Sequence, residues 1–430
     1  MNTADIKNRI CNGHLDSQLT SLLSVPSDRL SDERRRYSAA ADSFAEIYGD
    51  TDGVRLFSVG GRSEISGNHT DHNHGRVIAA AVNLDIISVA APSDDGEIRI
   101  KSEGFPEDRV PVSAADHPSE KLYFTSASII AGMVRAFIDA GYKVGGFRAY
   151  TTSNVLKGSG ISSSAAFEVM VGNILNYLYN DGEVSNVEIA KMAQFAENHY
   201  FGKPCGLMDQ TACAVGGFIT IDFLDPSSPK IESLDFDLTG AGYSLCLVNT
   251  GGNHADLNED YASVPAEMKA VAHLLGQDVL RGLTTDDLIA KAPEIRSQCG
   301  DRALLRAMHF ITENARVDEQ VAALKQGDID RFFRGVRDSG NSSFKYLQNV
   351  YTVKNVSEQG LSVALCITEN FLAGCRAACR VHGGGFAGTI QAFVPTELTS
   401  KYKSLIDSVF GDGACHILSV RKAGAFELSL

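Results

Sequence analysis

Residues 156–166 read Leu156-Lys157-Gly158-Ser159-Gly160-Ile161-Ser162-Ser163-Ser164-Ala165-Ala166, a stretch in which glycines and hydroxyls precede a helical pattern. Small residues let backbone N–H groups close around an anion, and the helix that follows points the positive end of its dipole at that anion. Serine hydroxyls in such a loop can also reach a bound Mg²⁺. The stretch therefore predicts a phosphate-binding loop. The alternative is a capped helix start that binds nothing.

A helix is expected directly after this loop. Ser162 or Ser163 is a suitable N-cap, because a serine hydroxyl accepts a hydrogen bond from an otherwise unpaired backbone N–H group. Apolar residues then recur with a helical period, at Ala165, Ala166, Val169, Met170, Ile174, Leu175 and Leu178.

The composition is that of a folded protein with room for two domains. The chain has 430 residues, of which 44% are hydrophobic and 21% charged. A net charge of −14 argues against a nucleic-acid surface, which needs a basic patch, but a single ATP can still be held by a few amides, cations and Mg²⁺. The sequence thus predicts no nucleic-acid partner and permits a nucleotide substrate.

No apolar run approaches the roughly 20 residues that span a bilayer, and the first residues lack the apolar core of a signal peptide. Nine scattered cysteines suggest free thiols rather than a disulfide framework. These features predict a cytoplasmic protein that does not bind membranes.

Hydrophobic periodicity and turn residues predict alternating helices and strands. The polar, glycine-rich segment 60–75 is expected to lie outside the core, and strands 84–91 and 97–102 are expected to form a hairpin. The other predicted elements are helices within residues 1–50, a strand at 54–59, a helix at 121–141, a strand at 146–152, a helix at 185–201 with Ser185 and Glu188 as a capping box, strands at 217–223 and 244–249, long helices to about 345 and two short strand-and-helix units.

Segment 60–75 carries many hydrogen-bonding side chains, which suits a polyhydroxylated ligand. Two other interpretations compete. Its histidines and Asp71 could bind Zn²⁺, although their spacing fits no standard site, or the segment could be a polar surface turn. The side chains concerned are Arg62, Glu64, Asn68, His69, Asp71, His72 and His74.

Residues 380–388 contain a GxGxxG pattern, but a strand is expected at 389–394, where a dinucleotide-binding fingerprint requires a helix. A glycine run before a strand instead lets two backbones, or a backbone and a phosphate, approach closely. The chain also lacks the motifs of P-loop enzymes, protein kinases and serine hydrolases.

Three segments in this order, GRxxxxGxHTDxNxG, GxGxSSSA and GGGFxG, resemble the signature motifs of the galactokinase branch of the GHMP small-molecule kinases. Residues 205–210, 306–309 and 313–317 also resemble segments of that family. The resemblance implies an α+β, two-domain GHMP kinase fold. Residues 1–235 would form an N-terminal domain with a left-handed βαβ unit, and residues 236–430 a ferredoxin-like C-terminal domain.

The resemblance also implies roles for individual residues. Asp209 and Arg62 match the catalytic pair, in which an Asp beside an Arg stays ionised and can accept the proton of the sugar hydroxyl. Ser164 and Glu197 match the Mg²⁺ ligands. ATP would be bound by Gly158, Ser159, Gly160, Ser162, Ser163 and Ser164, and the sugar by Asn68, His69, Asp71, Gly206, Tyr261, Gly384 and Gly385.

The implied reaction is ATP-dependent phosphorylation of galactose at its C1 hydroxyl, giving α-galactose 1-phosphate. Alternatives are a kinase for galacturonate or N-acetylgalactosamine, and a non-catalytic sugar sensor; the HTD-containing loop disfavours a mevalonate or homoserine kinase. The expected partners are the sugar and ATP, in a monomer or weak homo-oligomer.

The first motif departs from the family pattern in three places. Asn68 stands where Glu is usual, His72 where Tyr is usual, and Glu64-Ile65-Ser66 where Asn-Leu-Ile is usual. An amide at position 68 would not repel an anionic C6 group, so a 6-carboxylate sugar is conceivable, while galactose remains the leading substrate.

Overall fold

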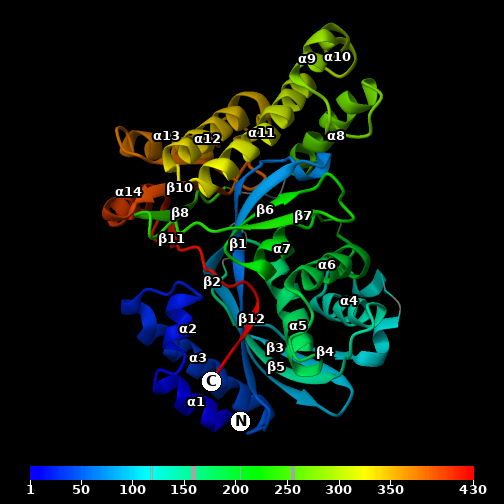
Figure 1. Ribbon diagram of the computed structural model, residues 1–430, viewed down its shortest axis with the longest axis vertical. Helices are drawn as coiled ribbons and strands as arrows, with labels where there is room; N and C mark the ends of the chain where they lie inside the picture. The colour runs from blue at the N-terminus through cyan, green and yellow to red at the C-terminus, as the bar shows by residue number, and fades with distance from the viewer. Residues whose placement is uncertain (117, 119, 156–160, 204, 253–256) are drawn as a thin grey trace.

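The computed structural model describes residues 1–116, 118, 120–155, 161–203, 205–252 and 257–430, and its elements are arranged around two β-sheets (Figure 1). The strands of the larger sheet follow the order β12-β1-β2-β5-β3-β4, with β6 and β7 attached through β2. Their bounds are β1 Arg55–Ser66, β2 Arg76–Ser93, β3 Glu97–Ser102, β4 Glu107–Pro111, β5 Gly146–Ser153, β6 Phe218–Asp222, β7 Lys230–Leu234 and β12 Phe426–Leu428.

The long strand β2 is the backbone of this sheet. One edge pairs with β1 along most of its length, and the other edge pairs first with β6 and then with β5. Successive side chains point to opposite faces: Ile87 and Val89 join the core under the N-terminal helices, while Ile86 and Ala90 join the main core. Figure 1 shows the two helical layers on either side. They are α1 Thr3–Cys11, α2 Asp16–Ser21 and α3 Leu30–Tyr48 on one side, and α4 Ser126–Asp139, α5 Ser163–Tyr179, α6 Asn186–Ala196 and α7 Met208–Val215 on the other.

The smaller sheet has the order β11-β8-β10-β9, with every pair antiparallel. Read along the chain this is a β-α-β-β-α-β arrangement, which confirms the predicted ferredoxin-like half. Helices α13 and α14 cover one face, and α12 packs on the other. The bounds are β8 Tyr243–Asn249, α8 Asn258–Leu274, α9 Thr285–Ala290, α10 Ala292–Gln298, α11 Asp301–Lys325, α12 Ile329–Ser342, α13 Gly360–Phe371, β9 Ala378–His382, β10 Thr389–Pro395, α14 Thr399–Phe410 and β11 Cys415–Leu418.

Two sequence predictions are wrong. Residues 60–66 belong to β1 and are buried, because the charges of Arg62 and Glu64 are neutralised by partners far away in the chain. Strands β2 and β3 do not form a hairpin, since β5 lies between them and pairs in parallel with β3. The connection from β3 to β5 runs through β4 and α4, and its left-handed sense stays a prediction from the resemblance.

The two halves of the chain share one core. The main core contains residues of both sheets, and the C-terminal strand β12 returns to pair with β1. The division near residue 235 remains a proposal. In the described part of the chain, no helix is long and apolar enough to cross a membrane. All nine cysteines are unpaired, as expected.

Candidate active site

The end of the serine loop is fixed to a bulge in β1. The register of β1 shifts between Gly60 and Arg62, and the Arg62 amide donates a hydrogen bond to the Ile161 carbonyl at 3.1 Å. A Cβ at Gly61 would lie 2.8 Å from that carbonyl oxygen, so only glycine allows the approach. The bulge therefore places the Arg62 side chain beside Ser162 at the start of α5. Gly158, Ser159 and Gly160 lie outside the described residues.

Arg62 and Asp209 form a two-pronged ion pair. The Nε and Nη2 atoms of Arg62 each donate to an Asp209 carboxylate oxygen at 2.7 Å. The Ser162 hydroxyl donates to the same carboxylate. Ser162 lies directly before α5 in the left-handed conformation, at φ 51°. Its side chain does not cap the helix, although Ser162 was one of the two predicted N-cap residues.

Burial by itself raises the pKa of Asp209, but the charge of Arg62 and the hydrogen bonds from Arg62 and Ser162 outweigh it, so that the pKa is lowered overall. The carboxyl group is therefore an anion near neutral pH. An ionised carboxylate held by one arginine and one hydroxyl can accept a proton from a substrate hydroxyl.

A cavity of about 220 Å³ opens beside this pair. Glu197, at the start of the turn Glu197–Phe201, is buried there and binds Lys203 at 3.2 Å and the Gln210 amide at 2.8 Å. Ser164 is exposed toward solvent on the first turn of α5. The described residues that line the cavity are Asp71, Ser162, Ser164, Glu197, Lys203, Cys205, Gly206, Met208, Asp209 and Gln210.

The loop after β1 meets the glycine turn between β9 and β10. Three successive carbonyl oxygens of that turn are bound by side chains: Gly383 by Asn68 at 2.7 Å, Gly384 by His69 at 2.9 Å, and Gly385 by Tyr261 at 2.8 Å. The strand expected after the glycine run is β10. The turn therefore holds the first and third motifs together.

Asp71 connects this loop to the cavity. A Cβ at Gly206 would lie 3.0 Å from Asp71 Oδ2, so the absence of a side chain at position 206 leaves the carboxyl room. Burial raises the pKa of Asp71. Asn68, in contrast, is fully buried and is not among the described residues that line the cavity. The side chain of Asn68 bonds to protein groups in this structure, and the sugar contact implied for it stays a prediction.

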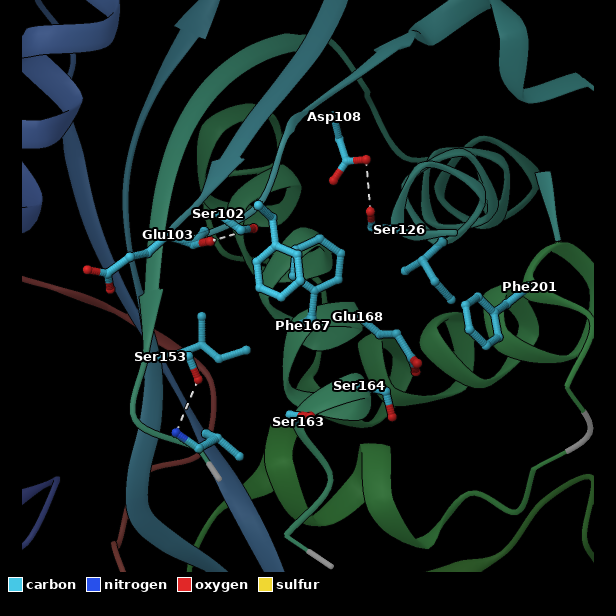
Figure 2. A pocket seen from close by; sticks show the side chains of 15 residues that line it. Ser102, Glu103, Asp108, Ser126, Ser153, Ser163, Ser164, Phe167, Glu168 and Phe201 are labelled. Carbon is cyan, nitrogen blue, oxygen red and sulfur yellow. Dashed lines mark hydrogen bonds between the residues drawn. The ribbon is translucent and has the colours of Figure 1, made fainter. Parts of the chain in front are cut away.

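A second, larger cavity of about 460 Å³ also has Ser164 in its lining (Figure 2). Figure 2 shows Ser163, Ser164 and Glu168 on one side and Asp108, bonded to Ser126, across from them. Ile86, Phe105, Ile129, Val155, Phe167 and Phe201 give the lining a largely apolar character. A flat, partly apolar group next to the serine loop would fit there.

Comparison with known proteins identifies the family. Residues 127–217 match the model for the GHMP kinases N terminal domain, and residues 42–92 match the galactokinase galactose-binding signature. Galactokinase of Streptomyces coelicolor is 31% identical over 374 residues, 86% of this chain and 92% of the relative, and galactokinase of Actinobacillus pleuropneumoniae is 31% identical over 375 residues, 85% and 92%.

The chain belongs to the galactokinase family. The fold agrees with this assignment. A crystal structure of Lactococcus lactis galactokinase complexed with galactose superposes with a TM-score of 0.76 at 24% identity, covering 92% of this chain and all of that one. A mevalonate kinase structure gives a TM-score of 0.61 at 13% identity over 85% of this chain and 99% of that one.

The structure thus brings together, in a galactokinase-family fold, residues predicted from three separate motifs. Arg62, Ser162 and Asp209 are in contact, and Ser164 and Glu197 line the same cavity. His69, Tyr261, Gly384 and Gly385 are joined to one another by hydrogen bonds at the glycine turn rather than in the cavity itself. Ser163 lines the larger cavity.

Sequence reasoning missed three polar residues of this galactokinase-family site. Gln210 donates to Glu197 and, at 3.0 Å, to Glu168, and Lys203 pairs with Glu197. Burial and then the charge of Glu197 raise the pKa of Glu168 to about 8. Lys203 and Gln210 are close in sequence to Asp209, and Glu168 is one helical turn after Ser164. Nearness to predicted site residues was therefore the signal by which the sequence could have indicated them.

The zinc interpretation of the first motif finds no geometry to support it. Within the residues described, no three His, Cys, Asp or Glu side chains are grouped so as to hold a metal. His72 is largely buried, and burial with the neighbouring charge of His69 lowers its pKa to about 3.

Proposed function

We propose that this protein transfers the γ-phosphoryl group of ATP to the C1 hydroxyl of galactose, giving α-galactose 1-phosphate and ADP. The observation that carries the proposal is the Arg62–Asp209 ion pair bound to Ser162 of the serine loop, at a cavity that Ser164 and Glu197 also line. Family membership and the match to the galactose-binding signature support the choice of sugar.

In the proposed reaction the C1 oxygen attacks the γ-phosphorus while the bond from that phosphorus to the β–γ bridging oxygen breaks. Asp209 accepts the proton of the C1 hydroxyl, and ADP leaves with the bridging oxygen. Arg62 keeps Asp209 ionised before the reaction and stabilises negative charge on the transferring group. Asp209 and Arg62 are the catalytic residues of the proposal.

Ser164 and Glu197 are proposed as the protein ligands of Mg²⁺. Both offer oxygen, which Mg²⁺ prefers, and the buried Gln210 Oε1 atom at the same cavity has no hydrogen-bond partner among the described residues. When bound, Mg²⁺ would neutralise phosphate charge on ATP. Few protein ligands suffice, because water and phosphate oxygens usually complete its coordination.

The larger cavity is proposed to take the nucleoside part of ATP, with the phosphates directed toward Ser162, Ser163 and Ser164. Gly158, Ser159 and Gly160 would complete the phosphate cradle. Around the sugar we propose contacts from His69, Asp71, Gly206, Tyr261, Gly384 and Gly385. Location in the cytoplasm and a monomeric or weakly oligomeric state stay predictions from the sequence.

The test is ATP-dependent ADP release by the purified protein with galactose, N-acetylgalactosamine, galacturonate and glucose. Turnover led by galactose is expected. A preference for an anionic C6 group would require Asn68 to face the substrate, and Asn68 is fully buried. If the protein prefers galacturonate or N-acetylgalactosamine, that sugar replaces galactose as the proposed substrate. Sugar binding without any turnover would favour the non-catalytic sensor and refute the proposal.

A further inference from the structure

The side chain of Asn68 is completely committed to other parts of the protein. Its Nδ2 atom donates to Glu64 Oε1 at 3.1 Å and to the Gly383 carbonyl at 2.7 Å. Its Oδ1 atom accepts from Ser343 Oγ at 3.2 Å and from Asn349 Nδ2 at 2.8 Å. A primary amide has two N–H donors and two lone pairs on its oxygen, so all four hydrogen-bonding capacities are used.

Only an amide satisfies this set of partners. A carboxylate at position 68 has no donor when ionised and would place its oxygens against the Glu64 carboxylate and the Gly383 carbonyl. Because the position is fully buried, that repulsion would not be screened by water.

The negative charge of Glu64 is balanced by a buried arginine. Arg380 Nη2 donates to Glu64 Oε1 at 2.8 Å, and its Nη1 and Nε atoms donate to the Ile65 and Val381 carbonyls. Arg380 has no exposed surface and lies on β9, directly before the glycine turn. Glu64, Asn68 and Arg380, named here the amide–carboxylate cluster, therefore connect β1, the loop after it and the turn 383–385.

Glu64 and Asn68 act as one unit in this cluster. The two side chains hydrogen-bond to each other, and Arg380 holds the Glu64 carboxylate beside the glycine turn.

We propose that Glu64 and Asn68 are a coupled pair of positioning residues that sets the affinity for the sugar without touching it. The pair holds the Gly383–Gly385 turn against the loop that carries His69 and Asp71, which are sugar contacts of the proposed function on which this inference rests. Neither member of the pair selects the C6 group of the sugar.

The test is a double-mutant cycle with isosteric replacements, Asn68→Asp, Glu64→Gln and both together, measured by steady-state kinetics with varied galactose and varied ATP. Asn68→Asp is expected to raise the KM for galactose by about tenfold or more and to leave the KM for ATP within about twofold, since a buried donor pair is lost and two carboxylates face each other. Adding Glu64→Gln to Asn68→Asp is expected to lower the raised KM for galactose again by at least about fivefold, because it removes the charge that faces Asp at position 68.

Asn176→Asp is the matched control. Asn176 is a buried asparagine of α5 that donates to a carbonyl and accepts from an amide of Val184, away from the cluster. It is expected to lower thermal stability without changing the KM for galactose. If Asn68→Asp does not fold, Ser343→Ala removes one donor to the same amide and is expected to raise the KM for galactose about twofold to fivefold.

The outcomes separate this inference from the proposed function. No galactose turnover by the unmodified protein refutes the proposed function. Normal turnover with an unchanged KM for galactose in Asn68→Asp, or purely additive effects in the double variant, refutes the coupled pair. In Asn68→Asp, a tenfold or larger change in the ratio of galactose turnover to galacturonate turnover would show that Asn68 contacts the sugar itself. Such a change corresponds to about 1.4 kcal/mol of discrimination between the two sugars.

Discussion

Asp209 is held between opposing influences at the scale of the single residue. Removal from water would make the carboxyl group a weaker acid, yet Arg62 and Ser162 keep its pKa below the ordinary value. The proton acceptor of the proposed reaction is therefore ionised throughout the neutral range. The activity of the protein is expected to decline in acid, where the pH falls through the lowered pKa of Asp209 and the carboxylate becomes protonated.

Asp209→Asn tests this role. The amide cannot accept the proton as a carboxylate does, and kcat is expected to fall by about 10²- to 10⁴-fold while ATP still binds. Steady-state kinetics and nucleotide titration measure the two effects. Asp222→Asn is the matched control, because Asp222 also pairs with arginines, Arg76 and Arg281, outside the cavity. Near-normal turnover by Asp209→Asn would remove Asp209 from the mechanism.

Glu197→Gln tests the proposed metal ligand. Loss of the anionic oxygen is expected to raise the Mg²⁺ concentration for half-maximal nucleotide binding by about tenfold or more, which titration of a non-hydrolysed ATP analogue with Mg²⁺ can measure. Glu188→Gln, in the capping box of the preceding helix α6, is the control, since glutamine also serves at that position. An unchanged Mg²⁺ requirement in Glu197→Gln would exclude Glu197 as a ligand.

At the scale of elements, the sequence predicted those helices and strands that short-range patterns of apolar and capping residues define. The period after the serine loop, the capping box of α6 and the buried strand β8 all correspond to observed elements. The end of β1 could not be predicted, because Arg62 and Glu64 look like loop residues until their partners, 147 and 316 positions away, are known. The site residues Lys203, Gln210 and Glu168 were missed for the same reason: their partners are set by tertiary contacts.

Helix α11 supports the first motif through one buried carboxylate. Glu313 accepts hydrogen bonds from the Gly67 amide, from the Ser339 hydroxyl and from Arg316. Burial would raise the pKa of Glu313, but Arg316, His309 and Arg380 lower it overall to about 2, from an ordinary 4.5. Because the folded pKa is the lower one, this group stabilises the fold fully above about pH 4.5, and the contribution is lost as pH falls toward 2.

Glu313→Gln is therefore expected to lower the free energy of unfolding near neutral pH by roughly 3 kcal/mol, with the difference shrinking below about pH 4.5. Urea unfolding at a series of pH values measures this. Glu319→Gln is the control on the same helix, because Glu319 is exposed and its pairing with Arg331 is expected to contribute less than about 1 kcal/mol. A Glu313→Gln protein as stable as the unmodified one near neutral pH would contradict the account.

At the scale of the whole molecule, the chain closes on itself. Strand β12 pairs with β1, and Arg421 is buried against Ser58 and the Gly424 carbonyl, so the last residues belong to the first sheet. The main core includes residues of both sheets. The family resemblance predicted two halves divided near residue 235, but the sequence could not show that the chain end returns, because a three-residue strand carries almost no local pattern.

This closure predicts a single cooperative unfolding transition. Leu428→Ala is expected to lower the midpoint of that transition by several degrees, because Leu428 is buried on the first sheet and its truncation costs about 2 kcal/mol or more. Differential scanning calorimetry measures the effect, and Glu427→Ala, on the alternate face of β12, should change it little. Two separate transitions, of which only one moves in Leu428→Ala, would contradict the shared core.

The most direct test of the central claim is the identity of the reaction product. Nuclear magnetic resonance of the mixture of protein, ATP, Mg²⁺ and galactose should show α-galactose 1-phosphate appearing in equal amount with ADP, and both products should form at least about 100-fold more slowly with Asp209→Asn. ATP consumption that does not depend on galactose, or phosphate on a hydroxyl other than C1, would contradict it.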